Sequence, residues 1–205
     1  MNLAVPCDMV AAVTAAGASS RMGEPKALLA WGDGTVLSTI LATLGRAGIT
    51  ESTVVAGAYS DAIAAEATRV GTSAILNEDW QRGRFSSVRI AAKWAQQRSA
   101  TLLLWPVDCP GVGEDTIRLL MQQARANPQA NVVPRFSDRG GHPVVLGPAT
   151  IDAIVNAGDD ANLRDFLQSD SATRVDVQVA DHAVVENINR PDDYETAKRE
   201  RARGS

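Results

Sequence analysis

The protein has 205 residues and a formal net charge of −4, with 45% hydrophobic and 21% charged residues. This composition is typical of a globular chain and argues against extended disorder. Its cations are spread out, which argues against a nucleic-acid binder, because such proteins concentrate basic residues in a patch. No run approaches the roughly 20 apolar residues that cross a membrane, so we expect a cytoplasmic protein without a membrane partner.

One compact domain over residues 1–205 is expected, because a chain of this length buries roughly 70% of the surface that its unfolded form exposes. No internal repeat and no Gly/Ser-rich linker divides the chain. The two cysteines, Cys7 and Cys109, form no CxxC pair, so neither a zinc site nor a disulfide scaffold is predicted.

The first predicted element is a strand over residues 9–16, whose small apolar residues suit a strand buried on both faces of a parallel sheet. A loop rich in Gly and Ser follows, and helical and strand-like segments then alternate. The predicted helices are 36–47, 61–70, 86–97 with Ser86 as its cap, 114–126, 148–156, 162–167 and 191–199. The other predicted strands are 52–56, 73–76, 101–105, 131–134, 142–146, 173–179 and 183–186. This order predicts an α/β fold with three layers, a doubly wound, mainly parallel, Rossmann-like sheet between helices.

The loop after the first strand carries Gly17, Ser19, Arg21, Gly23 and Lys26. Its glycines let the backbone bend tightly and turn N–H groups toward an anion, and its two cations add positive charge, so we predict that it holds a polyphosphate. A P-loop is excluded, because five residues rather than four separate the two glycines and Glu-Pro follows them. A dinucleotide fingerprint is excluded as well, because its third and sixth positions are Ser and Met here.

Asp108 follows the most apolar predicted strand and lies between Pro106 and Pro110. The carboxyl ends of strands in a doubly wound sheet share one edge, so we expect Asp108 to meet the phosphate loop despite their distance in sequence. A carboxylate on a backbone stiffened by prolines suits a Mg²⁺ ligand that must meet phosphate oxygens. A turn or helix-capping aspartate is the alternative interpretation. We interpret the neighbouring Cys109 as a small buried spacer.

The loop segment Ala15-Ala16-Gly17-x-Ser19-x-Arg21-Met22-Gly23-x-x-Lys26 resembles the opening motif of the nucleotidyltransferases that finish the molybdenum cofactor, in particular the molybdenum cofactor cytidylyltransferases. Further matching segments follow in the family's order at 77–87, 105–110, 141–143, 158–164 and 187–193. The resemblance implies a MobA-like nucleotidyltransferase with the fold of the nucleotide-diphospho-sugar transferases. It implies that residues 1–110 mainly bind the nucleotide and that 111–205 mainly bind the acceptor.

The resemblance and the loop chemistry together give a set of candidate site residues. The catalytic candidates are Arg21, Lys26 and Asp108, and the metal candidates are Asp108 and Asn189; the nucleotide-binding candidates are Ala15, Ala16, Gly17, Ser19, Arg21, Gly23, Lys26, Gly83 and Ser87; the acceptor-binding candidates are Gly141, His142, Asp159 and Arg164. Simpler interpretations stay open for several of these: an ordinary helix cap at Gly83 and Ser87, a structural His142, and a solvated helix start at Asp159.

Two features give opposite indications of the preferred base. Asn187-Ile-Asn189 stands where many cytidylyl relatives carry Asp-x-Asp, and it is closer to the guanylyl branch. A neutral amide binds Mg²⁺ more weakly than a carboxylate, and both asparagines could instead only shape the turn before the last helix. Ala16-Gly17 stands where guanylyl relatives have Gly-Gly, and its methyl leaves less room for a purine. We give the loop more weight, which favours CTP over GTP.

The expected reaction is a Mg²⁺-dependent transfer of CMP from CTP to a phosphate acceptor, a molybdopterin or molybdenum cofactor, with release of pyrophosphate. Such a reaction needs no covalent enzyme intermediate, because the acceptor phosphate is already nucleophilic. Two alternatives stay open. One is guanylyl transfer, or transfer to another phosphate acceptor. The other is a non-catalytic carrier that hands the molybdenum cofactor to a molybdoenzyme or its chaperone.

Overall fold

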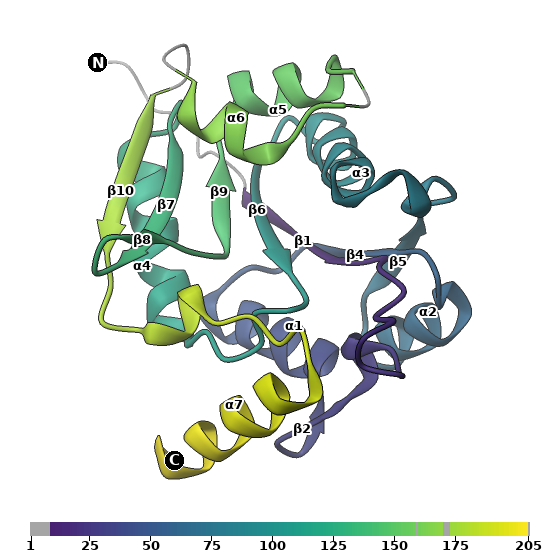
Figure 1. Cartoon of the computed structure of the whole chain (residues 1–205). Helices are drawn as coiled ribbons and strands as arrows, with labels where there is room; N and C mark the ends of the chain where they lie inside the picture. Colours follow the sequence, from purple (N-terminus) through teal and green to yellow (C-terminus); the bar gives the residue numbers. More distant parts are fainter. Residues whose placement is uncertain (1–8, 159, 170–172, 205) are drawn as a thin grey trace.

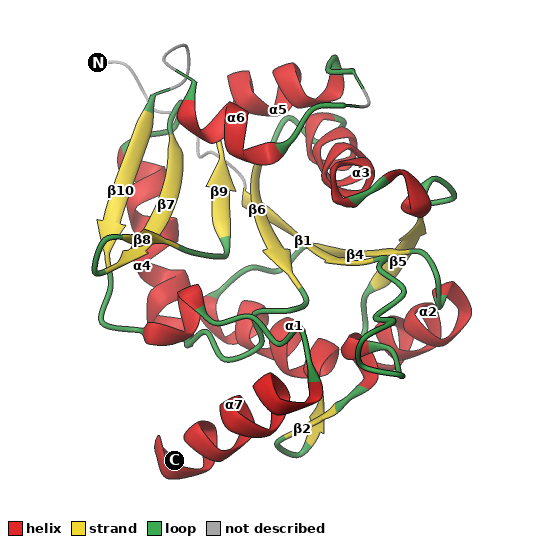
Figure 2. Ribbon diagram, viewed as in Figure 1, coloured by secondary structure: helices red, strands yellow, loops and turns green. Residues whose placement is uncertain are grey.

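Eight strands form one mixed sheet in the computed structural model, which describes residues 9–158, 160–169 and 173–204 (Figures 1 and 2). The strand order is β10-β7-β9-β6-β1-β4-β5, and the short β8 pairs with β7. Strands β1, β4, β5 and β6 are parallel, whereas β9 runs antiparallel to both β6 and β7. The strands are β1 (Met9–Ala15), β4 (Ser52–Ala56), β5 (Ser73–Leu76), β6 (Thr101–Pro106), β7 (Asn131–Phe136), β8 (Arg139–Gly140), β9 (Val144–Leu146) and β10 (Arg174–Gln178).

Helices cover both faces of the sheet, which confirms the predicted three-layer, doubly wound architecture (Figure 2). The central strand β1 is buried on both sides: Ala11 and Val13 belong to the core beneath α1 and α4, while Val10 and Ala12 belong to the core beneath α3 and α5. The helices are α1 (Val36–Ala47), α2 (Ser60–Arg69), α3 (Arg84–Gln96), α4 (Glu114–Ala126), α5 (Pro148–Val155), α6 (Leu163–Gln168) and α7 (Pro191–Gly204). No helix in the described ranges is long and apolar enough to span a membrane.

Three sequence predictions are corrected by the structure. Helix α3 begins at Arg84, not at a Ser86 cap, because Gly83 at φ 107° makes the turn into the helix and Ser86 Oγ donates to the Gly83 carbonyl at 2.7 Å. The predicted strand 183–186 is a 3-10 helix, η3 (His182–Val185), whose first turn is capped by Asp181 through the Ala183 N–H. Strand β9 begins at Val144 rather than at residue 142, because Pro143 has no N–H to give to the ladder.

Five short elements have no counterpart among the predictions. They are β8, η1 (Lys26–Leu28), the paired strands β2 (Ala30–Trp31) and β3 (Gly34–Thr35), and η2 (Trp80–Arg82). Helix α7 packs against strand β2. The Tyr194 hydroxyl of α7 donates to the Ala30 carbonyl, and the ring centroids of Trp31 and Tyr194 lie 6.1 Å apart. Helix α7 is therefore held against the molecule next to β2, below the sheet in Figure 1.

Candidate active site

A cleft of about 680 Å³ lies over the carboxyl ends of β1 and β6. From β1 the sheet continues to β4 on one side and to β6 on the other, and ligands bind where connections diverge in this way. Twelve of the candidate residues named from the sequence line this cleft: Ala15, Ala16, Gly17, Ser19, Arg21, Lys26, Gly83, Ser87, Asp108, His142, Arg164 and Asn189. Gly23 and Gly141 lie outside its lining, and Asp159 lies outside the described residues.

Ser19 gives the loop after β1 its shape. Its backbone has a left-handed φ of 50°, its carbonyl accepts from the Met22 N–H at 2.8 Å, and its Oγ accepts from the Lys26 N–H at 3.2 Å. Gly23, at φ 77°, makes the next bend without the steric penalty of a side chain. The loop thus curls back so that the Lys26 side chain enters the cleft while Gly17 stays exposed at its rim.

Lys26 links the loop to the segment before the last helix. Its Nζ donates to Asn189 Oδ1 at 3.0 Å, across 163 positions of sequence. Burial is the largest influence on the Lys26 pKa and lowers it, the Asp108 carboxylate partly raises it, and Arg84 lowers it further. The amine is therefore close to both metal candidates and partly deprived of water, which strengthens its attraction to an anion.

The two predicted metal candidates are joined through the backbone. The Asp108 carbonyl accepts from the Ile188 N–H at 2.8 Å, which fixes the end of β6 against the segment that carries Asn189. The N–H of Asn189 in turn donates to Asp193 Oδ2 at 2.9 Å in the first turn of α7. These contacts hold a carboxylate and an amide oxygen at one end of the cleft.

The two asparagines of this segment make different contacts. Asn187 Oδ1 accepts from the Cys109 thiol at 3.0 Å, whereas Asn189 Oδ1 accepts from Lys26. Cys109 is fully buried, and burial together with Asp108 raises the pKa of its thiol. The interpretation of Cys109 as a buried spacer therefore agrees with its environment, and Asn189 is the asparagine that faces the cations of the cleft.

Hard oxygen donors in this arrangement fit a magnesium ion. Asp108 and Asn189 could supply two oxygen ligands, and Mg²⁺ commonly takes one or two protein ligands and completes its shell with water and substrate phosphates. Among the described residues that line the cleft, Asp108 is the one carboxylate, and the cations are Arg21, Lys26, Arg84 and Arg164. The charge balance of the cleft favours a polyanion.

The start of α3 forms a second wall of the cleft. Asn77, fully buried after β5, donates through Nδ2 to Ser86 Oγ and to Ser87 Oγ, each at 2.9 Å. The free N–H groups of the first turn lie next to Ser87 and attract anions or polar ligand atoms. Sequence reasoning missed Arg84 and Asn77 as contributors; the signal was present in the matched segment 77–87, where both residues occur.

We expect Asn77→Ala to destabilise the fold by about 1–3 kcal/mol, because it removes the amide that donates to the buried Ser87 hydroxyl and one of the two hydrogen bonds of the Ser86 hydroxyl. It should also weaken nucleotide binding, since the first turn of α3 loses its anchor. Urea unfolding and a nucleotide titration measure the two effects. Glu78→Ala is the control, because Glu78 is the exposed neighbour and should change neither quantity. Wild-type stability of Asn77→Ala would contradict this account of the wall.

His142 and Arg164 mark the other side of the cleft. The His142 N–H donates to the Val184 carbonyl at 2.7 Å, and burial, the largest influence, lowers the pKa of its imidazole while Asp108 raises it and Arg84 lowers it further. Its Nδ1 is buried without a hydrogen-bond partner among the described residues. Gly141 does not line the cleft and is packed closely against Val184. A Cβ at residue 141 would lie 2.9 Å from the Val184 Cβ, so the position has no room for a side chain. The imidazole lines the cleft, and burial favours its neutral form.

The sequence matches the family model of the MobA-like NTP transferase domain over residues 11–176, a range that includes all or part of every strand of the sheet. The chain belongs to the MobA-like NTP transferase family. The matched range contains the predicted phosphate loop, Asp108 and His142. Asn187 and Asn189 lie beyond the end of the matched range.

Two characterised relatives differ in the activity that their names state. The chain is 30% identical to the nicotine blue oxidoreductase of Paenarthrobacter nicotinovorans over 171 residues, which are 80% of this chain and 83% of the relative. It is 25% identical to the molybdenum cofactor cytidylyltransferase of Escherichia coli (strain K12) over 186 residues, 91% and 93% of the two chains. The two relatives therefore do not fix the reaction of this chain, and the chemistry of the cleft has to distinguish between them.

Solved structures bear out the fold. The structure of Rv0371C from Mycobacterium tuberculosis H37Rv in complex with manganese matches with a TM-score of 0.75 at 24% identity, over 94% of this chain and 98% of that one. The expected likeness to nucleotide-diphospho-sugar transferases is confirmed as well, because structures of that class match with TM-scores of 0.71 and 0.78.

Proposed function

We propose that the protein transfers CMP from CTP to a phosphate acceptor of the molybdopterin or molybdenum cofactor type, with Mg²⁺ as its metal, and releases pyrophosphate. The observation that carries this proposal is the meeting of Lys26, Asp108 and Asn189 in one cleft, with Lys26 Nζ 3.0 Å from Asn189 Oδ1. The family match supplies the nucleoside triphosphate, and the relative at 25% identity supports the acceptor.

The proposed reaction is a single in-line displacement. An oxygen of the acceptor phosphate forms a bond to the α-phosphorus, and the bond from that phosphorus to the bridging oxygen breaks, so that its electron pair leaves with pyrophosphate. Mg²⁺, held by Asp108 and Asn189, would neutralise charge on the phosphates. Arg21 and Lys26 stabilise the charge that develops on the transferring and leaving groups. Positioning and electrostatics then account for the catalysis without a covalent intermediate.

The preference for cytosine rests on the tight packing of Ala16. Its carbonyl accepts from the Ala58 N–H at 3.0 Å, and the chain at Gly57 approaches so closely that a Cβ there would lie 2.8 Å from the Ala16 methyl and 2.7 Å from the Trp80 Cβ. The loop therefore has little freedom to retreat from a bulky base. A pyrimidine fits this wall better than a purine, which supports CTP and leaves GTP as the alternative.

The test is a melting experiment with CTP, GTP, ATP and UTP, each with and without Mg²⁺. A ligand at 100 times its dissociation constant adds about 2.7 kcal/mol of stability, which gives a clear shift. A selective, Mg²⁺-dependent shift with CTP, followed by pyrophosphate release with molybdopterin as acceptor, is the expected result. A selective shift with GTP would move the proposal to guanylyl transfer. No shift with any nucleotide would overturn it in favour of a cofactor carrier that serves a molybdoenzyme or its chaperone.

A second candidate is reduction of a flat, conjugated substrate. It is favoured by the 30% identity to a relative named as an oxidoreductase and by the single carboxylate among the described residues that line the cleft. The cations of the cleft, rather than the glycine fingerprint that this chain lacks, would then bind the pyrophosphate of a reduced nicotinamide dinucleotide, which gives a hydride while water supplies a proton. A melting shift with that dinucleotide that does not need Mg²⁺, together with its oxidation by a quinonoid dye, would favour this candidate over transfer.

A further inference from the structure

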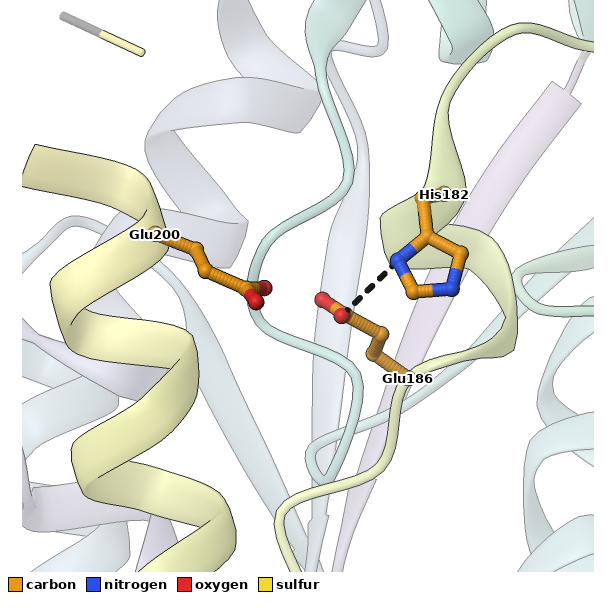
Figure 3. A group of neighbouring side chains, drawn as sticks. All are labelled: His182, Glu186 and Glu200. Atoms are coloured by element: carbon orange, nitrogen blue, oxygen red, sulfur yellow. Dashed lines mark ion pairs between the residues drawn. The ribbon is translucent and has the colours of Figure 1, made fainter. Parts of the chain in front are cut away.

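Three side chains with metal-binding groups meet away from the cleft, where η3 faces the last helix. They are His182 and Glu186, from η3 and the segment after it, and Glu200 from α7, and we call them the His182 cluster (Figure 3). One ligand atom from each lies within 4.8 Å of those of the other two. In the part of the chain that the structure describes, no other three His, Cys, Asp or Glu residues come together in this way. The cluster lines a second cavity, of about 510 Å³.

We propose that the His182 cluster binds a divalent transition-metal cation such as Zn²⁺ and thereby ties α7 to η3. The ligand set is one imidazole nitrogen and two carboxylate oxygens, and nitrogen ligands suit zinc and its neighbours whereas Mg²⁺ selects oxygen ligands. Three protein ligands leave further coordination positions for water. This site is separate from the proposed function, and its test does not depend on nucleotide transfer.

Two of the three ligands are already held in place. His182 Nδ1 lies 2.9 Å from Glu186 Oε1 (Figure 3), and the rings of His182 and Phe136 form a T-shaped pair with centroids 4.9 Å apart. The backbone below them is fixed as well, because Asp181 caps η3 and its Oδ2 also accepts from the Gly113 N–H at 2.9 Å. A cation at this point would meet a site that is largely preorganised.

The charges around the cluster favour a cation between the two glutamates. The Glu186 and Glu200 carboxylates face each other across the cluster, and Glu186 is half-buried. The other charged groups of the cavity are Arg46, Glu114, Asp181 and Arg201, of which Arg46 is paired with Glu114 at 2.9 Å and Arg201 lies over the Trp31 ring. A divalent cation relieves the repulsion between the two carboxylates that burial makes costly.

Small movements complete the site: Glu200 moves closer, and the His182–Glu186 pair, 2.9 Å apart, opens as the proton between them leaves to water. Zinc–nitrogen and zinc–oxygen bonds of about 2.0–2.2 Å place tetrahedral ligands roughly 3.4 Å apart, somewhat closer than the 4.8 Å limit seen here. Glu200 is exposed near the end of α7, so its side chain can make this adjustment (Figure 3). A bound cation would then link α7, which begins just after Asn189, to η3, whose Val184 carbonyl holds the His142 N–H.

The test uses the full-length protein, stripped of metal by a chelator and titrated with Zn²⁺ by calorimetry in a large excess of Mg²⁺. Glu200→Gln and His182→Gln each remove one ligand. Mutating a residue that only hydrogen-bonds to a metal ligand costs about 10–100-fold in metal affinity. Each of these variants changes a ligand itself, so its zinc affinity should fall about tenfold or more. Glu195→Gln is the matched control, because it makes the same charge change at an exposed position of the same helix. Hydrogen exchange of the α7 amides provides the second measurement and should slow with Zn²⁺ in the wild type and in Glu195→Gln alone.

Three results would overturn the proposal. The first is the absence of zinc binding in the wild type, and the second is an unchanged zinc affinity in Glu200→Gln. The third is a zinc signal that Asp108→Asn abolishes, since the zinc would then lie in the cleft.

Discussion

Replacing Asp108 by asparagine is expected to lower the rate of Mg²⁺-dependent nucleotidyl transfer by about 10²–10³-fold, the effect of removing one preorganised electrostatic contact to the reacting group. Asp108 is the one carboxylate among the described residues of the cleft lining, and the second proposed metal ligand, Asn189, is neutral. No second acidic group of that lining can compensate. Pyrophosphate release, measured across a range of Mg²⁺ concentrations, should show a lower maximal rate and a higher Mg²⁺ requirement.

The fold should survive this change, because the structural contact of Asp108 is made by its backbone carbonyl, which accepts from the Ile188 N–H. Asp115→Asn is the control. It makes the same change of charge outside the cleft lining, on α4, where the Asp115 side chain is 95% exposed. An Asp108→Asn protein that kept both its full rate and its Mg²⁺ requirement would remove Asp108 from the metal site.

The position of the cleft could be predicted because it depends on two strong signals. The residues of β1 and β6 are apolar enough to be recognised as buried parallel strands, and both faces of β1 are indeed buried. Once these two strands are parallel neighbours, their carboxyl ends must share an edge of the sheet. The phosphate loop and Asp108 follow those ends directly, so their meeting was predictable from the order of elements alone.

Details that depend on long-range contacts were beyond the sequence. The bond between Lys26 and Asn189 joins two turns 163 positions apart, and no local pattern encodes such a pairing. The segment 183–186 has the β-branched residues of a strand, yet it forms η3 because the Asp181 side chain caps its first turn, and among the described residues it packs beside β7 without joining the ladder of the sheet. Tertiary context therefore overrode a local preference there.

The structure also separates two residues that the sequence treats as a pair. Asn187 accepts from a buried thiol and so helps to fix the end of β6, while Asn189 Oδ1 accepts from Lys26 among the cations of the cleft. A neutral Asn187 is well suited to its place, because a carboxylate so close to Asp108 would add like charge. The Asn-x-Asn sequence thus offers no acidic side chain at either position, and Asn189 is the one of the two that we propose as a metal ligand.

Lys26→Met is expected to reduce the transfer rate by about 10²–10³-fold, because the amine is aimed at the site where charge develops on the phosphates. The same change should stabilise the protein without ligand. Burial lowers the pKa of Lys26 in the folded state, so at neutral pH the unfolded state accommodates the charged amine better than the native state does. Methionine fills a similar volume without that penalty, although the bond to Asn189 is lost.

The pH dependence distinguishes this explanation from a general effect on packing. A group with a lowered folded pKa makes the wild type less stable below that pKa, and the penalty disappears as the pH rises toward 10.5, the ordinary value for the amine. The stability advantage of Lys26→Met in urea unfolding should therefore shrink with rising pH. Lys93→Met, at an exposed position of α3, should show neither the advantage nor the loss of activity.

If Lys26→Met kept its turnover, Lys26 would serve only to shape the loop, and phosphate stabilisation would have to come from the arginines. A protein that is less stable with its lysine than without it has retained that lysine for function rather than for folding.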